Sequence, residues 1–303
     1  MKPHPTGDAT RRISDRVRRI EVTTRLLSSE AFHGGVQSRF RGRGMDFDEV
    51  REYEPGDDVR SIDWSATARA GHTFVKKYRE ERQLTVLFVL DMSASGSLGT
   101  GDSSKRDQAV EMASVLALSA VQSDHRIGLV AFTDAVESFV PAARGRPHAL
   151  RLVRDLVGFE PEGRGTDLAL ALRFVRERQR RRAVIVILSD FLIGQRGMDQ
   201  AREELRALAQ RHDVVGIRLG DPLDRQLPPV GLLTLEDAET GEVVEIDTRR
   251  ASRRARLQAI AKDVDERIRG FARQARVDLL EVDTMRPYLG PLIGFFRTRG
   301  GRT

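Results

Sequence analysis

The sequence of 303 residues contains no cysteine. This absence excludes disulfide frameworks, zinc–thiolate and iron–sulfur sites, and catalysis by a thiol. No apolar stretch reaches the roughly 18–20 residues that a membrane-spanning helix requires, and the first thirty residues lack the apolar segment of a secretory signal. We therefore expect a cytoplasmic protein without a transmembrane segment.

Lysine is scarce as well. Five of the 51 basic residues are lysines, and the arginines are mostly interleaved with acidic residues at spacings typical of solvated helix faces. The net charge of +6 therefore does not indicate a phosphate-binding surface. The sequence also has no aromatic and basic platform, finger or helix-turn-helix signature, so we expect no nucleic-acid partner.

Signatures of common enzyme classes are missing too. The sequence has no Gly-x-x-x-x-Gly-Lys-Ser/Thr phosphate loop and no Gly-x-Ser-x-Gly elbow, and its six histidines form no pair at metal-ligand spacing. The alternative that stays open is a magnesium-dependent phosphatase-like hydrolase with Asp91 as its nucleophile. That chemistry usually needs a second carboxylate two residues later, where this chain has Ser93. We therefore expect a protein that is not an enzyme.

What the chain does contain is an alternation of strand and helix patterns. Apolar runs predict strands over residues 84–90, 126–132, 183–188 and 214–219, and helical spacing predicts helices over residues 106–121, 147–157, 166–180 and 198–211. Further along, the pattern predicts a hairpin over residues 232–236 and 242–246, a helix over 252–274 and a strand over 277–282. Strands that alternate with helices predict an α/β fold with a doubly wound, mostly parallel, Rossmann-like sheet.

Three regions differ in composition. Residues 1–83 are dense in charge and are predicted to form a small β-rich N-terminal module, residues 84–285 the α/β domain, and residues 286–303 a C-terminal tail. The pattern favours a wedge that ion pairs fix against the α/β domain, with a partner-docking surface or a second ion site as the alternative. The expected buried side of the wedge consists of Met45, Phe47, Val50, Tyr53 and Trp64.

Oxygen-bearing side chains follow the predicted strands. Asp91, Ser93 and Ser95 come after the first apolar run, Asp190 comes after residues 183–188, and Thr166 opens a helix at the same edge. In an open parallel sheet such positions converge beyond the carboxyl ends of the strands. Each residue taken singly is also an ordinary cap or turn residue, so the prediction depends on the whole set.

Carboxylate and hydroxyl oxygens without nitrogen or sulfur donors suit magnesium, manganese or calcium. With two anionic ligands, a dication would stay under-neutralised and would still attract an anion from outside. The glycine-containing loops at residues 96–101 and 163–165 are expected to leave room for that anion, the first of them as a flexible loop.

At these residues the sequence resembles a von Willebrand factor A domain, whose metal-ion-dependent adhesion site contains Asp-x-Ser-x-Ser, then a Thr, then an Asp at strand ends. The resemblance implies that Ser93, Ser95 and Thr166 bind the metal directly. It also implies that Asp91 and Asp190 act directly or through water, and that a protein partner's Asp or Glu fills the open position. Magnesium is the expected ion, with manganese or calcium as alternatives.

The block at residues 39–82 carries a second resemblance. It includes Arg41-Gly-Arg-Gly-Met-Asp-Phe-Asp-Glu-Val-Arg-Glu-Tyr53 and Glu54-Pro-Gly-Asp-Asp-Val-Arg-Ser-Ile-Asp-Trp64. With the strand end Ser189-Asp-Phe191, it resembles the bacterial domain-of-unknown-function family 58, in which the block precedes a von Willebrand A domain. The resemblance implies a metal-dependent protein-interaction module that works with a MoxR-type ATPase of the AAA+ class in assembly or maturation of other proteins.

Overall fold

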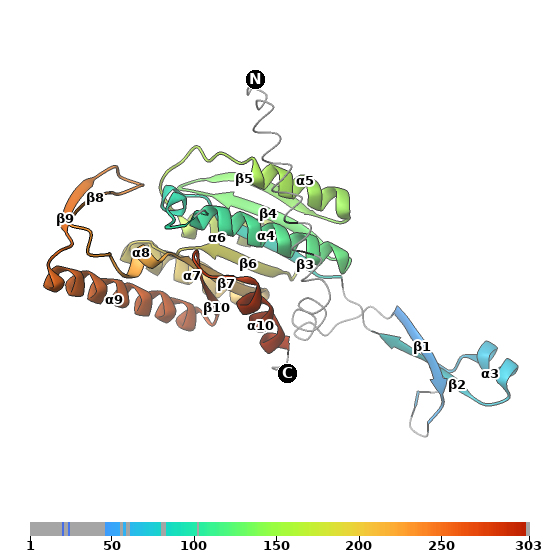
Figure 1. The fold of residues 1–303 in the computed structure, drawn as a ribbon. Helices are drawn as coiled ribbons and strands as arrows, with labels where there is room; N and C mark the ends of the chain where they lie inside the picture. Colours follow the sequence, from blue (N-terminus) through green and yellow to red (C-terminus); the bar gives the residue numbers. More distant parts are fainter. Residues whose placement is uncertain are drawn as a thin grey trace.

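The computed structural model describes residues 46–54, 57–58, 61–79, 83–101 and 103–300, together with Ile20 and Thr24. Its centre is a six-stranded sheet with the strand order β10-β7-β6-β3-β4-β5 (Figure 1). All neighbouring strands in it are parallel except β4 and β5, which are antiparallel. The expected α/β fold with a mostly parallel sheet is therefore confirmed.

The order of the strands shows where the chain reverses its direction across the sheet. From β3 the chain runs outward to β4 and β5, and it then returns to β6, on the other side of β3, before reaching β7 and β10. The switch between the two halves of the sheet therefore lies between β3 and β6. The strands span β3 Thr85–Asp91, β4 Arg126–Phe132, β5 Val136–Ala143, β6 Val184–Ser189, β7 Asp213–Gly220 and β10 Asp278–Asp283.

Helices cover both faces of the sheet, as a doubly wound fold requires. Strand β3 alternates its side chains between two cores: Val86, Phe88 and Leu90 belong to one, and Leu87 and Val89 to the other. This alternation explains why a central strand is an uninterrupted apolar run. The first core is completed by α4 (Lys105–Gln122), α5 (Arg146–Val157) and α10 (Leu289–Gly300), and the second by α6 (Leu168–Arg178), α7 (Gln195–Arg211) and α9 (Ala251–Ala275).

Strand β5 and helix α10 were not predicted. Strand β5 is an edge strand with half-buried side chains, and Pro141 within it breaks the apolar pattern that marks the central strands. Helix α10 lies within the expected C-terminal tail, where Gly290, Pro291 and Gly294 argue against a helix by propensity. The burial of its Phe296 in the core on the α4 side overrides that propensity.

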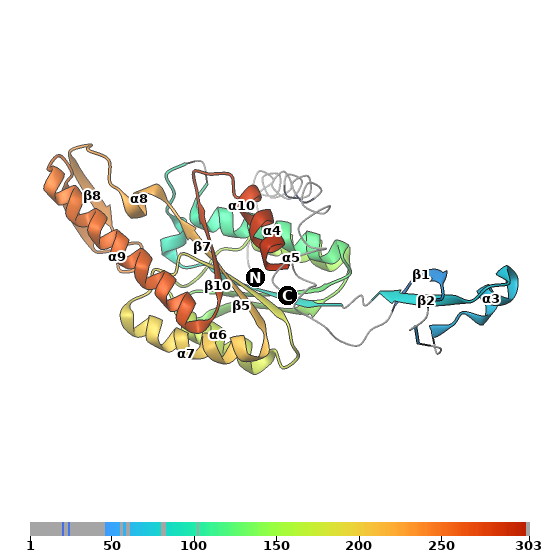
Figure 2. The same cartoon turned by 90° about the horizontal axis from the view of Figure 1, so that it is seen from below.

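The described part of the N-terminal module is a small antiparallel ribbon of β1 (Asp46–Glu52) and β2 (Phe74–Arg79), joined through α3 (Trp64–Ala70). Figures 1 and 2 both show it to one side of the six-stranded sheet. Trp64 is 69% exposed and Tyr53 is 37% exposed, so their expected burial is wrong. A two-stranded ribbon with one short helix has no second layer to cover such side chains. Met45 and most of residues 1–45 lie outside the described residues.

A separate hairpin of β8 (Leu232–Glu236) and β9 (Val243–Asp247) follows the short helix α8 (Pro222–Arg225). It was predicted within a residue at each end, and it interrupts the connection from β7 to α9. In Figure 1 it lies beyond the end of the sheet at which β3 and β6 finish. None of the described helices is long and apolar enough to cross a membrane.

Candidate functional site

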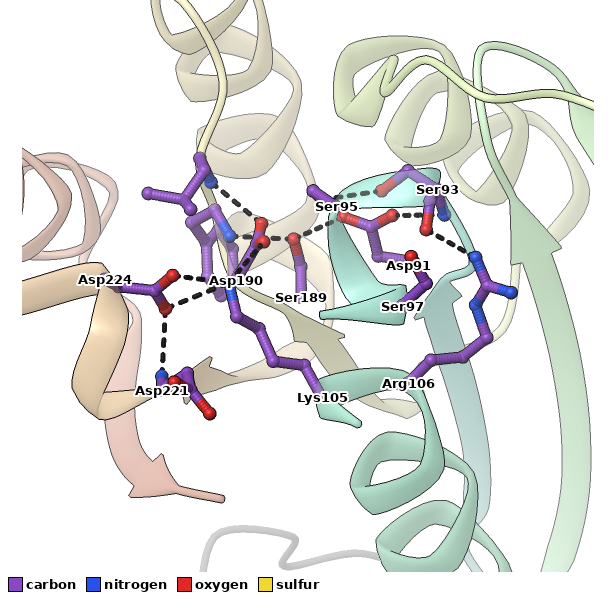
Figure 3. Close-up of polar contacts among 12 residues, drawn as sticks. Asp91, Ser93, Ser95, Ser97, Lys105, Arg106, Ser189, Asp190, Asp221 and Asp224 are labelled. Carbon is purple, nitrogen blue, oxygen red and sulfur yellow. Dashed lines mark hydrogen bonds and ion pairs between the residues drawn. The ribbon is translucent and has the colours of Figure 1, made fainter. Parts of the chain in front are cut away.

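The switch between the two halves of the sheet brings the predicted carboxylates together. Asp91 is the last residue of β3, and Asp190 directly follows β6. Strands β3 and β6 are parallel neighbours in the sheet. Ligands of open α/β sheets bind outside the carboxyl ends of the strands at such a switch. Figure 3 shows both aspartates at this edge, with Ser93 and Ser95 beside Asp91.

Asp91 is held on both of its carboxylate oxygens. Its Oδ1 accepts a hydrogen bond from the Ser93 backbone N–H at 3.0 Å, and its Oδ2 accepts one from the Ser189 hydroxyl at 2.6 Å. The hydroxyl oxygens of Ser93 and Ser95 are 3.1 Å apart. A small cavity is lined by Asp91, Ser95 and Asp190 together. The structure thus gathers four of the five predicted residues within one cluster.

Burial makes this cluster electrostatically unusual. The side chains of Asp91 and Asp190 are 6% and 5% exposed. Burial, and then the charge of Asp190, raise the pKa of Asp91 to about 6, although hydrogen bonds from Ser189 and Ser93 act in the opposite direction. The ionised form of Asp91 is therefore costly in the metal-free protein, and a cation bound there would offset that cost.

Lys105 also belongs to this site, although it lies just before the helix predicted over residues 106–121. It is the first residue of α4, because Ser104 caps the helix in a capping box with Asp107. Its ammonium Nζ lies 3.3 Å from Asp190 Oδ2 and 2.9 Å from Asp224 Oδ2, and the side chain is 1% exposed.

The two carboxylates decide the protonation state of that lysine. Burial alone would lower the pKa of Lys105, but the charges of Asp190 and Asp224 outweigh it and raise the pKa above its usual value. The ammonium therefore stays charged. With Arg106 near Asp91, two cationic side chains face the three carboxylates of Asp91, Asp190 and Asp224, so the acids outnumber the cations by one.

The turn after β6 is strained in a way that fixes Asp190. Phe191 has a φ of 56°, in the left-handed region that costs an aromatic residue about 1–2 kcal/mol. Its N–H donates to the Ser189 hydroxyl, and its buried ring lies 6.3 Å from that of Phe271. Leu192 N–H donates to Asp190 Oδ1 at 3.0 Å. Strain that packing and hydrogen bonds maintain next to a carboxylate is typical of a functional position.

Thr166, the fifth predicted residue, contacts a partner that the sequence did not suggest. Its hydroxyl donates to Glu239 Oε1 in the β8–β9 turn at 2.6 Å. Thr166 is not the N-cap of α6, because Asp167 takes that position and accepts from the Leu170 N–H. Burial and the nearby charge of Asp190 raise the pKa of Glu239, while its hydrogen bond with Thr166 lowers it. The contact of Thr166 is thus with Glu239, and the described contacts do not join it to Asp91 or Asp190.

The loops around the site are more closely held than expected. A Cβ at Gly163 would lie 2.2 Å from Asp134 Oδ1, so this glycine permits a close approach of two loops and does not leave room above an ion. Its N–H donates to Glu137 Oε1 at 2.8 Å. Thr100, in the loop of residues 96–101, donates through its N–H and its hydroxyl to Asp221. Both loops are therefore tied to the sheet domain by hydrogen bonds.

The donor set fits a hard dication. Two buried carboxylates lie beside serine hydroxyls, and no nitrogen or sulfur ligand is needed. Within the described residues, no group of three or more His, Cys, Asp or Glu side chains is arranged to hold a metal ion. A cation at this edge would therefore depend on the hydroxyls as ligands.

The alternative of Asp91 as a phosphatase nucleophile gains no support from the geometry. The position two residues later is Ser93, whose hydroxyl pairs with Ser95, and both oxygens of Asp91 already accept hydrogen bonds. A general acid for the leaving group is therefore missing at the position where that chemistry needs one.

Comparisons with known proteins agree with the resemblance at residues 39–82. Residues 49–267 match the family described as protein of unknown function DUF58. The uncharacterized protein Rv1480 of Mycobacterium tuberculosis is 36% identical over 288 residues, which cover 93% of this chain and 88% of that protein. Among solved structures, BatB of Bacteroides thetaiotaomicron is similar over 73% of this chain and 100% of its own, at 14% identity and a TM-score of 0.46. The von Willebrand A domain of SpRpn10 is similar over 71% of this chain and 95% of its own, at 10% identity and a TM-score of 0.40.

Proposed function

This chain belongs to the DUF58 family, and we propose that its sheet edge around Asp91 and Asp190 is a metal-dependent protein-interaction site that works in the cytoplasm. The observation that carries this proposal is the buried pair of carboxylates beside the hydroxyls of Ser93 and Ser95. A carboxyl whose pKa is raised to about 6 by burial and by a second carboxylate is costly to keep ionised at neutral pH. A bound dication offsets that cost.

Five residues would hold the cation: Asp91, Ser93, Ser95, Thr166 and Asp190. Magnesium is the first candidate, and manganese or calcium would suit the same oxygen donors. When bound, the metal supplies an electrophilic centre that accepts a carboxylate oxygen from a protein partner.

The chain's own groups orient these ligands. The Ser189 hydroxyl holds Asp91, Lys105 holds Asp190, and the Arg106 guanidinium donates to the Ser93 carbonyl oxygen at 2.7 Å. Such neighbours fix the direction in which each donor points, and their loss commonly weakens metal binding.

Metal binding can be tested by titrating the purified chain with Mg²⁺ and Mn²⁺ in a calorimeter. The wild type should bind one dication, and Asp91→Ala and Asp190→Ala should each abolish the heat of binding while the far-UV circular dichroism stays unchanged. Asp263→Ala is the matched control, because Asp263 is an exposed acid on α9 that pairs with Arg267. Undiminished binding by the Asp91→Ala, Asp190→Ala double variant would refute the site.

The partner we propose is a MoxR-type AAA+ ATPase, or a client protein of that ATPase, in assembly or maturation of other proteins. This part of the proposal comes from the family resemblance. The test is capture of the purified ATPase from the same organism by the immobilised chain, in magnesium and in chelator. Capture should require magnesium and be lost with Asp91→Ala, and equal capture in chelator would show that the metal takes no part.

A further inference from the structure

The tip of the β8–β9 hairpin holds a carboxylate against Thr166, one of the five proposed metal ligands. Glu239 accepts the hydrogen bond from the Thr166 hydroxyl at 2.6 Å, although the two residues are 73 positions apart in the chain. Glu239 thus places a carboxylate oxygen within hydrogen-bond distance of a hydroxyl that would itself bind the cation.

The turn that carries Glu239 is closed by its own hydrogen bonds. Asp237 Oδ1 accepts from the N–H groups of Glu239 and Thr240, both at 2.9 Å. The Gly241 N–H donates to the Asp237 carbonyl oxygen at 2.7 Å, and Gly241 has a φ of +74°, which a residue with a Cβ rarely adopts. The turn therefore holds Glu239 at the tip without help from the site itself.

The base of the hairpin is fixed in a different way. Thr248 is completely buried, and its hydroxyl accepts from the N–H groups of Val230 and Gly231 and donates to the Gly231 carbonyl oxygen. Between this base and the tip, strand side chains such as Leu232 and Val243 are 64% and 58% exposed. Few buried apolar contacts thus hold the tip, and it can leave the site while the base stays in place.

We propose that Glu239 is an internal ligand, which occupies the position that a partner's carboxylate would take at the bound cation. This inference rests on the proposed function. A ligand attached to the same chain acts at a high effective concentration, so it excludes weak or free carboxylates. A partner with several contacts could displace it, and the hairpin would then move away about its fixed base. Glu239 would thus compete with the partner's carboxylate for the bound cation.

The test uses Mn²⁺ as the probe, because the relaxation of water protons reports the waters bound to this paramagnetic ion. The full chain is compared with Glu239→Gln and with Glu242→Gln, a matched control whose acid is exposed on the same hairpin. We expect all three proteins to bind Mn²⁺. Glu239→Gln should show a higher relaxation rate per bound ion, because water replaces the lost carboxylate, while the control should match the wild type.

A second measurement adds free acetate to the Mn²⁺-loaded proteins. Acetate should displace water from Glu239→Gln at a concentration about tenfold lower than from the wild type or the control. Equal relaxation and an equal response to acetate in all three loaded proteins would overturn the internal-ligand proposal and leave the metal site standing. Failure of the wild type to bind Mn²⁺ would instead refute the proposed function and this inference with it.

Discussion

Replacing Asp91 with asparagine should stabilise the metal-free protein even though it removes a proposed metal ligand. Burial and the charge of Asp190 raise the pKa of Asp91 from 3.8 to about 6. At pH 7 the carboxylate is ionised, and a shift of about two pK units corresponds to about 3 kcal/mol of destabilisation relative to a neutral side chain. Asparagine removes this cost at every pH.

The substitution also has a cost of its own. Asparagine keeps a carbonyl oxygen to accept from the Ser93 N–H, but its amide group cannot accept from the Ser189 hydroxyl as Asp91 Oδ2 does. The loss of one acceptor for a buried hydroxyl costs about 1 kcal/mol. We therefore expect a net gain of about 2 kcal/mol in the free energy of unfolding at pH 7, with metal removed.

The gain should depend on pH. A carboxyl with a raised pKa binds a proton more tightly in the folded protein, so the wild type recovers stability as the pH falls from above 6 toward 3.8. Between pH 7 and pH 5 the advantage of Asp91→Asn should shrink by about 1 kcal/mol. Burial lowers the pKa of His212, which destabilises the fold over the same range, but this residue is common to both proteins and cancels in the difference.

The assay is urea unfolding in chelator at pH 5 and pH 7, followed by far-UV circular dichroism. Fluorescence is unsuitable because the single tryptophan, Trp64, is exposed in the N-terminal module. Magnesium at a hundredfold excess over its dissociation constant should stabilise the wild type by about 2.7 kcal/mol and leave Asp91→Asn unchanged. The reasoning fails if Asp91→Asn is less stable than the wild type at pH 7, or if the difference is the same at both pH values.

Four further outcomes are expected. Lys105→Met should lower the free energy of unfolding by about 3–5 kcal/mol, because Asp190 then lies buried without the ammonium that pairs with it. Added magnesium should restore part of this loss in urea titrations, and an unchanged unfolding midpoint in chelator would contradict the prediction. Trp64→Ala should change stability by less than about 0.5 kcal/mol, since the ring is exposed, and a loss of several kcal/mol would mean that the module is packed. Phe296→Ala should cost about 3–5 kcal/mol by thermal or urea unfolding, because α10 is part of the core, whereas a freely removable tail would show no loss. Thr166→Val keeps the shape of the side chain but removes its hydroxyl, so calorimetry should show weaker Mn²⁺ binding, and equal affinity would exclude Thr166 as a ligand.

The parts of the site that could be predicted are those fixed by the sheet alone. Asp91 and Asp190 follow strands that are buried on both faces, and parallel neighbours bring their carboxyl ends to one edge whatever the loops do. Lys105 was missed because its role depends on where the capping box starts α4. Lysine is rare in this arginine-rich chain, so a lysine at the start of a helix could have been taken as a sign of a site residue. Glu239 could not be found, since its position depends on how a surface hairpin folds back toward the loop that contains Thr166.

The same limit applies to the fold. Continuous apolar runs located the central strands, but β5 has a mixed pattern because an edge strand is half-buried. Helix α10 contains residues of low helix propensity and is stabilised by burial of Leu292 and Phe296 in the core. Both elements depend on contacts with distant parts of the chain, which local pattern does not record.

The β8–β9 hairpin is inserted in a crossover connection and contributes no strand to the central sheet. Connections of this kind tolerate changes in length and sequence at little cost in stability, because loop closure depends weakly on length. Selection can therefore act on the hairpin separately from the proposed cation ligands at the ends of β3 and β6. If Glu239 blocks the site as proposed, a change of that one residue would leave the site open to a partner without altering the core or those ligands.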